Sequence, residues 1–212
     1  MRPLAGRSAE GDLTEHHRRV LKAWTSARTP GPAHEHLARR AGVWDLTTRT
    51  WSEETVEPTV TRSTARRRMT LGGRILEERV AAELLDAPFE GFGVTGYDNV
   101  RQRWWSSWMD TMSTAPVHTV SPGSDQGEAV GAGPSQTGPD SRKLETEAIV
   151  MIGSYVDPLS GEVREVRTVT RVLDEDREVF EWWELRPDGS EMKTMETLYR
   201  RRAAEDDAPG AP

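Results

Sequence analysis

The tryptophan-rich segment from Phe89 to Asp110 carries the side chains best suited to form a ligand site. Its second half, RWWSSWMD, has the composition of a β-strand, and successive side chains of a strand point to opposite faces. One face then presents Trp104, Ser106, Trp108 and Asp110. Two indoles four residues apart on one face lie roughly 13 Å from each other and offer broad apolar surfaces, while a carboxylate beside them anchors a polar group. This face therefore suits the wall of a pocket for a small apolar or aromatic molecule.

A buried carboxylate needs a partner, and two arginines on other predicted strands are candidates for Asp110. Arg171 and Arg74 both lie on strands expected to line the same interior. We include Arg171 as the second polar anchor and Met112, just past the tryptophan strand, as a further part of the wall. Two alternatives stay open for Asp110: a structural salt bridge, or the acid/base of a cofactor-free lyase, cyclase or isomerase.

Several sequence motifs for nucleotide binding, catalysis and metal binding are incomplete or absent in this chain. Gly91, Gly93 and Gly96 have the spacing of a dinucleotide-binding motif, but the segment continues into another strand instead of a helix, so close packing is the better interpretation. No G-x-S-x-G motif is present. The five histidines do not have the spacing of a zinc site, and His118 alone falls on a predicted strand. We expect no metal and no cofactor.

The composition narrows the function classes. The chain has 212 residues, a hydrophobic fraction of 35%, a net charge of −7 and no cysteine. Disulfides and thiolate catalysis are therefore excluded, and the acidic balance argues against nucleic-acid binding. No apolar run approaches the roughly 20 residues of a membrane span, and the first residues lack the apolar core of a secretory signal. We expect a cytoplasmic protein that interacts with neither nucleic acid nor membrane.

The elements that must position these residues are mostly strands. From Val43 onward the apolar residues follow a period of two, interrupted by Gly/Asp/Asn/Pro turns. The predicted strands are Val43–Trp51, Thr59–Thr70, Arg74–Ala82, Phe89–Tyr97, Arg101–Asp110, Ala115–Val120, Leu144–Val156, Glu162–Leu173, Glu178–Leu185 and Glu191–Arg201. Ten short antiparallel strands hide their edges most simply in a closed meander barrel, which commonly holds one small ligand. Alternation in the C-terminal strands is too mixed to decide whether residues such as Glu181, Lys193 and Tyr199 face the interior.

The remaining segments flank or interrupt this barrel domain, which we place at residues 29–202. Residues 1–28 form an extension with a short amphipathic helix, whose apolar stripe of Leu13, Val20, Leu21 and Trp24 allows an oligomer or a partner contact. A second short helix, roughly Ala33–Arg40, is expected to plug one end of the barrel. The Gly/Pro/Ser-rich insert 121–141 is expected to be a flexible loop, and residues 203–212 a disordered tail.

Ordered sequence signatures between about Pro30 and Arg202 resemble one bacterial family, the domain of unknown function 1579. They are PGPAHEHL, GVW, LGGRILEE, GFGVTGYDN, WSSWMDTMST, DPLSGE, VRTVTRV, VFEWWELRPDGSEMK and METLYRR. The Gly42-Val43-Trp44 opening is also similar to the G-x-W start of lipocalins, which are closed barrels with a ligand cup. The resemblance implies a lipocalin-like fold and a pocket, and it assigns no reaction. In this chain the insert is longer than is usual for the family, and residues 1–28 are additional.

The sequence thus predicts an all-β closed barrel of about ten strands that binds a small apolar or aromatic molecule through Trp104, Trp108, Asp110, Met112 and Arg171. The alternatives are the Asp110-dependent enzyme and a structural or partner-binding module that acts through the N-terminal helix.

Overall fold

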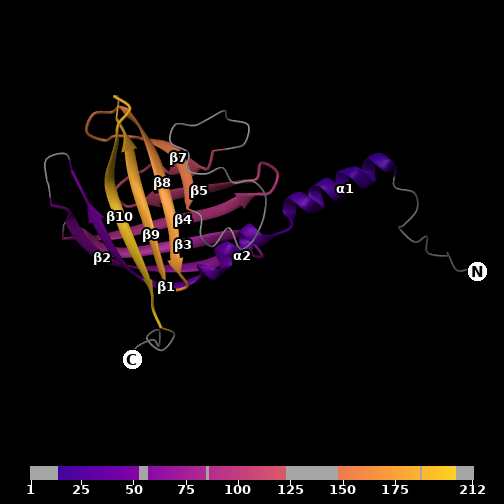
Figure 1. The fold of residues 1–212 in the computed structure, drawn as a ribbon, viewed down its shortest axis with the longest axis horizontal. Helices are drawn as coiled ribbons and strands as arrows, with labels where there is room; N and C mark the ends of the chain where they lie inside the picture. The colour runs from indigo at the N-terminus through magenta and orange to yellow at the C-terminus, as the bar shows by residue number, and fades with distance from the viewer. Residues whose placement is uncertain (1–13, 53–56, 85, 123–147, 187, 204–212) are drawn as a thin grey trace, which may run out of the picture.

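A computed structural model of the chain describes residues 14–52, 57–84, 86–122, 148–186 and 188–203 (Figure 1). Two helices precede ten strands in this part of the chain. They are α1 (Glu15–Arg28), α2 (Pro32–Arg39), β1 (Gly42–Thr50), β2 (Thr59–Thr70), β3 (Ile75–Leu84), β4 (Ala87–Asp98), β5 (Arg103–Asp110), β6 (Val117–Val120), β7 (Ile149–Val156), β8 (Val163–Asp174), β9 (Arg177–Leu185) and β10 (Glu191–Arg201).

The strands form a closed antiparallel barrel. Each strand pairs with its neighbours in the chain, and β1 pairs with β10 to complete the ring. Closure leaves no unpaired sheet edge, which is the physical reason for expecting a barrel from ten short strands. The predicted fold class is confirmed.

Most element boundaries agree closely with the sequence pattern. β2 and β10 have the predicted limits, and α2 begins and ends one residue earlier than expected. The strand β6 is shorter than predicted because Ala115 and Pro116 remain in the turn after β5. Four predictions fall largely or partly outside the described residues: the flexible insert at positions 123–141, the start of the predicted strand Leu144–Val156 at positions 144–147, the disordered tail from position 204, and the first 13 residues of the N-terminal extension.

The core consists of two apolar clusters inside the barrel. One joins α2 to the strands through Ala33, Leu37, Leu76, Trp104, Ile149 and Met151. The other consists of Trp44, Leu46, Ala65, Val80 and Tyr199, with Phe89, Trp108 and Phe180 packed against it. Because residues of α2 belong to the first cluster, this helix covers one end of the barrel, as expected for a plug.

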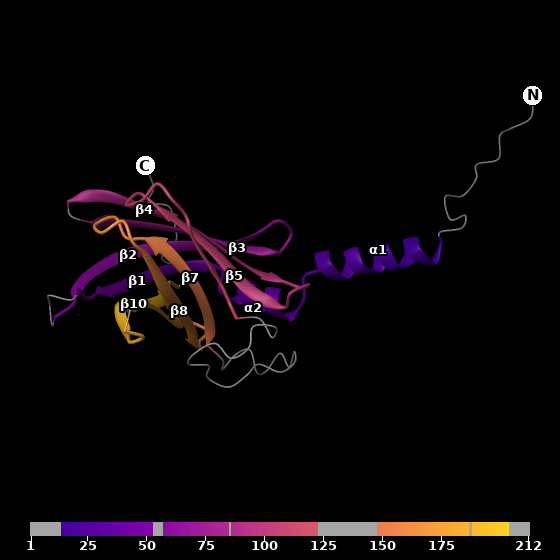
Figure 2. The ribbon, with the colours of Figure 1, turned by 90° about the horizontal axis from the view of Figure 1, so that it is seen from above.

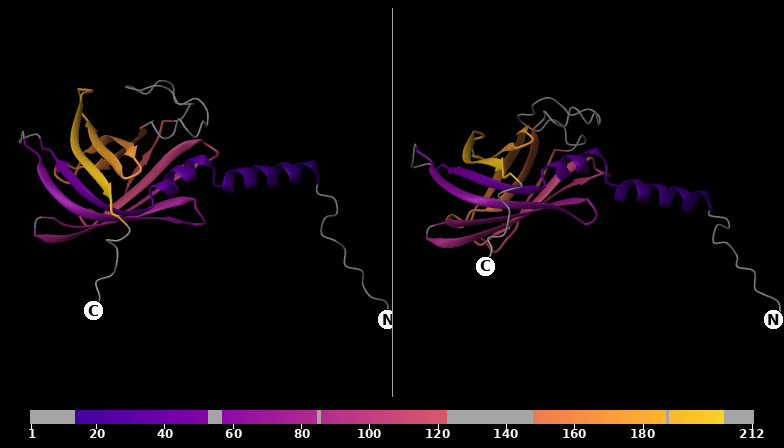
Figure 3. Two further views of the ribbon diagram at one scale, coloured as in Figure 1. Left: turned by 60° about the horizontal axis from the view of Figure 1, so that its bottom comes forward. Right: turned by 90° about the horizontal axis from the view of Figure 1, so that it is seen from below.

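The helix α1 extends away from the barrel (Figures 2 and 3). It has no buried residue, and the side chains of Leu21 and Trp24 are 54% and 70% exposed. Its C-terminal end is held by the Asn99 amide, which donates to the backbone carbonyls of Ala27 and Thr29 at 3.1 and 2.8 Å. Within the described residues no helix is long and apolar enough to cross a membrane.

Candidate ligand site in the barrel interior

The face of β5 that carries Trp104 and Trp108 points into the barrel. Trp104 is 3% exposed in the core cluster beneath α2, and Trp108 packs against the second cluster. Directly paired residues share a face of the sheet, and Ser106 pairs with Thr119, whose side chain is also buried. This register supports the prediction that Trp104, Ser106 and Trp108 share one face of β5.

Two glycines of β4 make room for the Trp108 indole. A Cβ atom at Gly91 would lie 2.4 Å from Cζ2 of this ring, and one at Gly93 would lie 2.9 Å from Cε3. Gly93 is also the direct cross-strand partner of Trp108. The close-packing interpretation of the glycines is therefore supported: they form a flat bed for an inward-facing indole.

The carboxylate of Asp110 orients this indole and caps the following turn. Its Oδ2 accepts a hydrogen bond from Trp108 Nε1 at 2.8 Å, and its Oδ1 accepts one from the backbone N–H of Met112 at 2.9 Å. Neutral donors thus satisfy both oxygens. Asp110 therefore holds the Trp108 indole in one orientation on the inner face of the barrel.

The two arginines expected near Asp110 lie elsewhere, which corrects the predicted pair. Arg171 Nη1 donates to Glu181 Oε2 at 2.6 Å, and Arg171 follows the inward-facing Thr170, so it lies on the outer face of β8. Arg74 belongs to the β2–β3 turn, where its guanidinium donates to the carbonyl of Leu71. The mixed charge pattern of these strands did not reveal which residues face out.

Met112 is also displaced from the predicted wall. It lies in the turn after β5 and is 65% exposed, at the end of the barrel opposite α2. Of the five predicted residues, the structure thus brings Trp104, Trp108 and Asp110 to one inward face. Met112 lies on the rim, and Arg171 lies outside.

The end of the barrel opposite α2 has aromatic side chains that face inward and are still partly exposed. Trp182 pairs with Thr168, which in turn pairs with the buried Met151, so the indole of Trp182 points inward. The same register places Phe180 inward. Phe89, Trp108, Phe180 and Trp182 are all intermediate in exposure. Solvent therefore reaches apolar rings on the inner wall at this end, whereas Trp104 at the α2 end is buried.

The floor beneath these rings contains one buried polar atom without a partner. His36 on α2 is 4% exposed, and its ring centroid lies 5.8 Å from that of Trp104. The Nε2 atom of His36 is buried and makes no hydrogen bond within the described residues. Burial, with a further contribution from Arg40 and Arg39, lowers the pKa of His36 to about 4, so the ring is neutral at pH 7.

A buried ion cluster closes the α2 end. Glu178, which is 1% exposed, accepts two hydrogen bonds from Arg40 at 2.7 Å and further bonds from Arg67 at 3.2–3.3 Å. Burial by itself would raise the pKa of Glu178, but the two guanidiniums outweigh it and lower the pKa to about 2. The Arg67 guanidinium also lies 4.2 Å from the ring centroid of Tyr199. This cluster holds α2 against the strands.

Sequence reasoning missed both His36 and this cluster as parts of the interior. The available signal was the position of Arg40, which follows His36 by four residues and Leu37 by three, because side chains at these two spacings are neighbours on a helix surface. Within the residues that the structure describes, no group of three or more His, Asp or Glu side chains is arranged to hold a metal ion.

The fold and this interior define a ten-stranded antiparallel barrel that is covered at one end and lined with aromatic rings at the other. The chain belongs to the family described as "Protein of unknown function (DUF1579)", whose model matches residues 29–201. No curated protein sequence gave a significant match. Among solved structures, a redesigned β-barrel is similar to 81% of this chain, over 96% of its own length, with 11% identity and a TM-score of 0.36.

Proposed function

We propose that the protein binds a small, largely apolar or aromatic molecule inside the barrel, entering at the end opposite α2. The observation that carries this proposal is the set of inward-facing rings that solvent still reaches, Phe89, Trp108, Phe180 and Trp182. Inward-facing rings in a fully packed core would be buried, as Trp104 and Trp44 are. Apolar and aromatic linings with a few polar groups are typical of small-molecule sites.

His36 supplies one such polar group. Because its neutral ring has a buried Nε2 atom without a partner, a ligand carrying one hydrogen-bonding group near the floor gains a contact that the empty protein leaves unmade. We therefore expect a ligand with an apolar body and one polar end. Asp110 acts indirectly, through the hydrogen bond that orients Trp108.

Fluorescence enhancement of the neutral apolar probe N-phenyl-1-naphthylamine tests this proposal. The full chain should give saturable enhancement, and Trp182→Ala should weaken binding about tenfold or more, because one stacking ring in a pocket contributes on the order of 1–3 kcal/mol. The matched control is Trp183→Ala, the neighbouring residue on the outer face of β9, whose ring lies under Arg167 and Lys193.

The two variants separate interior binding from adhesion to an outer apolar surface. Equal effects of Trp182→Ala and Trp183→Ala would place the probe outside the barrel. A folded protein that gives no saturable enhancement with this probe would overturn the proposal. Trp24→Ala should leave the affinity unchanged, since the indole of Trp24 lies on α1 and not in the barrel.

A further inference from the structure

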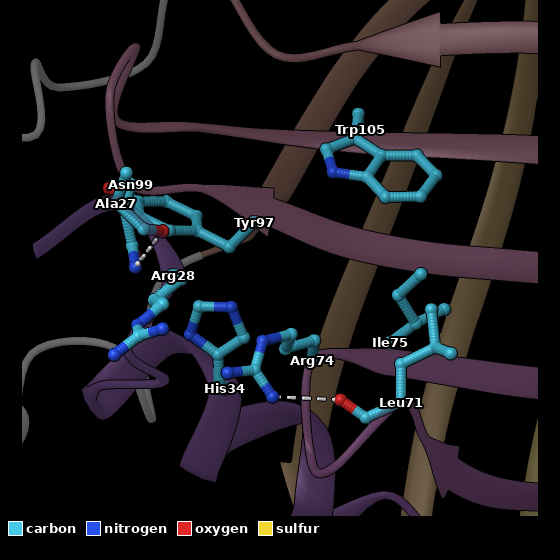
Figure 4. Close-up of a pocket in the computed structure, with 9 residues that line it drawn as sticks. All are labelled: Ala27, Arg28, His34, Leu71, Arg74, Ile75, Tyr97, Asn99 and Trp105. Carbon is cyan, nitrogen blue, oxygen red and sulfur yellow. Dashed lines mark hydrogen bonds between the residues drawn. The ribbon is translucent and has the colours of Figure 1, made fainter. Parts of the chain in front are cut away.

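A second pocket lies outside the barrel, where α1, α2 and the strand ends meet. It has a volume of about 190 Å³ and is drawn in Figure 4. Its side chains come from α1, α2, the β2–β3 and β4–β5 turns and strands β3, β4 and β5. Ile75 and Trp105 belong to the outward-facing sets of β3 and β5, whereas the ring of Tyr97, which packs on Trp104 of the core, borders the pocket from the barrel side.

Most of the side-chain polar groups that line this pocket are hydrogen-bond donors, and the acceptors among them are the Asn99 amide oxygen and the Tyr97 hydroxyl. Arg28 has no ion pair within the described residues, and Arg74 makes hydrogen bonds only to the backbone carbonyls of Leu71 and Gly72. Figure 4 shows the imidazole of His34 between these two arginines. The indole N–H of Trp105 has no hydrogen-bond acceptor within the same part of the chain, and none of the nine lining residues is acidic.

The histidine presents a donor as well. The backbone N–H of Gly31 donates to Nδ1 of His34 at 3.1 Å, so Nδ1 must be an acceptor. Burial and the neighbouring Arg74 lower the pKa of His34, which keeps the ring neutral at pH 7. A neutral ring with an accepting Nδ1 carries its proton on Nε2. His34 is 5% exposed, and this Nε2 is without a hydrogen-bond partner in the described residues.

We infer that this pocket is a binding site for a small organic carboxylate with an aliphatic or aromatic body. Two guanidiniums without carboxylate partners provide bidentate recognition of a carboxylate, and Nε2 of His34 adds a third donor. Leu71, Ile75 and Trp105 supply apolar contacts for the body of the ligand. The volume is below the roughly 300–1,000 Å³ of sites for drug-sized ligands, which favours a molecule of one ring.

Titration of the ¹⁵N-labelled full chain with sodium benzoate at constant ionic strength tests this inference. The indole N–H signal of Trp105, assigned by its loss in Trp105→Phe, should shift and saturate. Benzamide, which has the same ring without the charge, should cause no saturable shift. Arg74→Gln and Arg28→Gln should each weaken benzoate binding about tenfold or more, because each removes a charged hydrogen-bond donor.

The matched control is Arg19→Gln, which removes an exposed arginine from the same helix as Arg28 but outside the pocket, and which should leave the affinity unchanged. Equal affinity in Arg74→Gln, Arg28→Gln and Arg19→Gln would overturn the inference, as would saturable binding of benzamide. Binding of inorganic phosphate in place of benzoate would overturn the assignment to an organic carboxylate. Because Arg28 is on the exposed α1, its variant tests the site even if Arg74→Gln disturbs the β2–β3 turn.

Discussion

Glu178 is the residue whose charge most directly holds the barrel to its covering helix. It is buried with two guanidiniums, Arg40 from the end of α2 and Arg67 from β2. Replacing Glu178 by Gln keeps the shape but leaves two buried positive charges without their shared anion. We expect a loss of about 3–5 kcal/mol in the free energy of unfolding, measured by urea denaturation.

An exposed ion pair provides the control for this substitution. Asp45 accepts hydrogen bonds from Arg202, and its side chain is 56% exposed. Asp45→Asn makes the same change from carboxylate to amide and should cost less than about 1 kcal/mol. Similar losses in the two variants would contradict the role given to the buried cluster.

His36 and Glu178 together predict loss of stability in acid, in two successive pH ranges that overlap only near pH 4 to 4.5. The folded-state pKa of His36 is about 4 against an ordinary value of 6.5, so unfolding takes up a proton as the pH falls below 6.5. Stability should therefore decline between about pH 6.5 and 4. The pKa of Glu178, lowered to about 2 from 4.5, adds a further decline below about pH 4.5.

Substitution of the histidine isolates the first window. His36→Leu should reduce the slope of the free energy of unfolding between pH 6.5 and 4.5 and leave the decline below pH 4.5. The part that remains between pH 6.5 and 4.5 belongs to His34, whose pKa is lowered as well. A variant with the wild-type slope between pH 6.5 and 4.5 would show that another group is responsible.

At the scale of elements, the stability of the β4–β5 hairpin depends on the close packing of the Trp108 ring against Gly91 and Gly93. Gly91→Ala would bring a Cβ atom against the edge of the Trp108 ring. Overpacking of this kind typically costs 1–3 kcal/mol, so we expect about that loss in unfolding free energy. Combining it with Trp108→Leu removes the clash, and a double-mutant cycle should show coupling of more than about 1 kcal/mol. Additive effects would contradict the fit.

The same hairpin shows why much of the fold could be predicted from the sequence. Alternation along β5 placed Trp104 and Trp108 on the same face, because successive side chains of a strand point to opposite faces. Asp98 and Asn99 marked the turn between its two strands, and the Asp98 carboxylate accepts hydrogen bonds from the backbone N–H groups of Val100 and Arg101.

The strand β9 shows where this reasoning fails. Its two faces carry Glu178, Phe180 and Trp182 on one side and Glu181 and Trp183 on the other, so composition does not distinguish them. In β10 a register shift between Lys193 and Met195 interrupts the alternation as well. The ion partners of Glu178 are 111 and 138 positions away in the chain, and only the closed ring brings them together.

At the scale of the whole molecule, the barrel and α1 should behave as independent parts. α1 contributes no buried residue, and an isolated helix of 14 residues is marginal in water. A chain beginning at residue 29 should therefore unfold within about 3 °C of the full chain, as measured by circular dichroism. A loss of more than about 8 °C would show that α1 supports the barrel.

The exposed apolar stripe of α1 predicts self-association through a second copy of the chain. Val20, Leu21 and Trp24 are exposed on a helix with four basic residues and one acidic residue, in a chain whose net charge is −7. Two α1 helices repel each other, whereas the acidic remainder of a second copy attracts this helix, so the contact should join unlike surfaces. Sedimentation at low ionic strength should show a species heavier than the 23.8 kDa monomer, and Trp24→Ser or high salt should reduce it. A full chain that sediments as a monomer at low ionic strength, or a Trp24→Ser variant that associates as strongly as the native sequence, would contradict this contact.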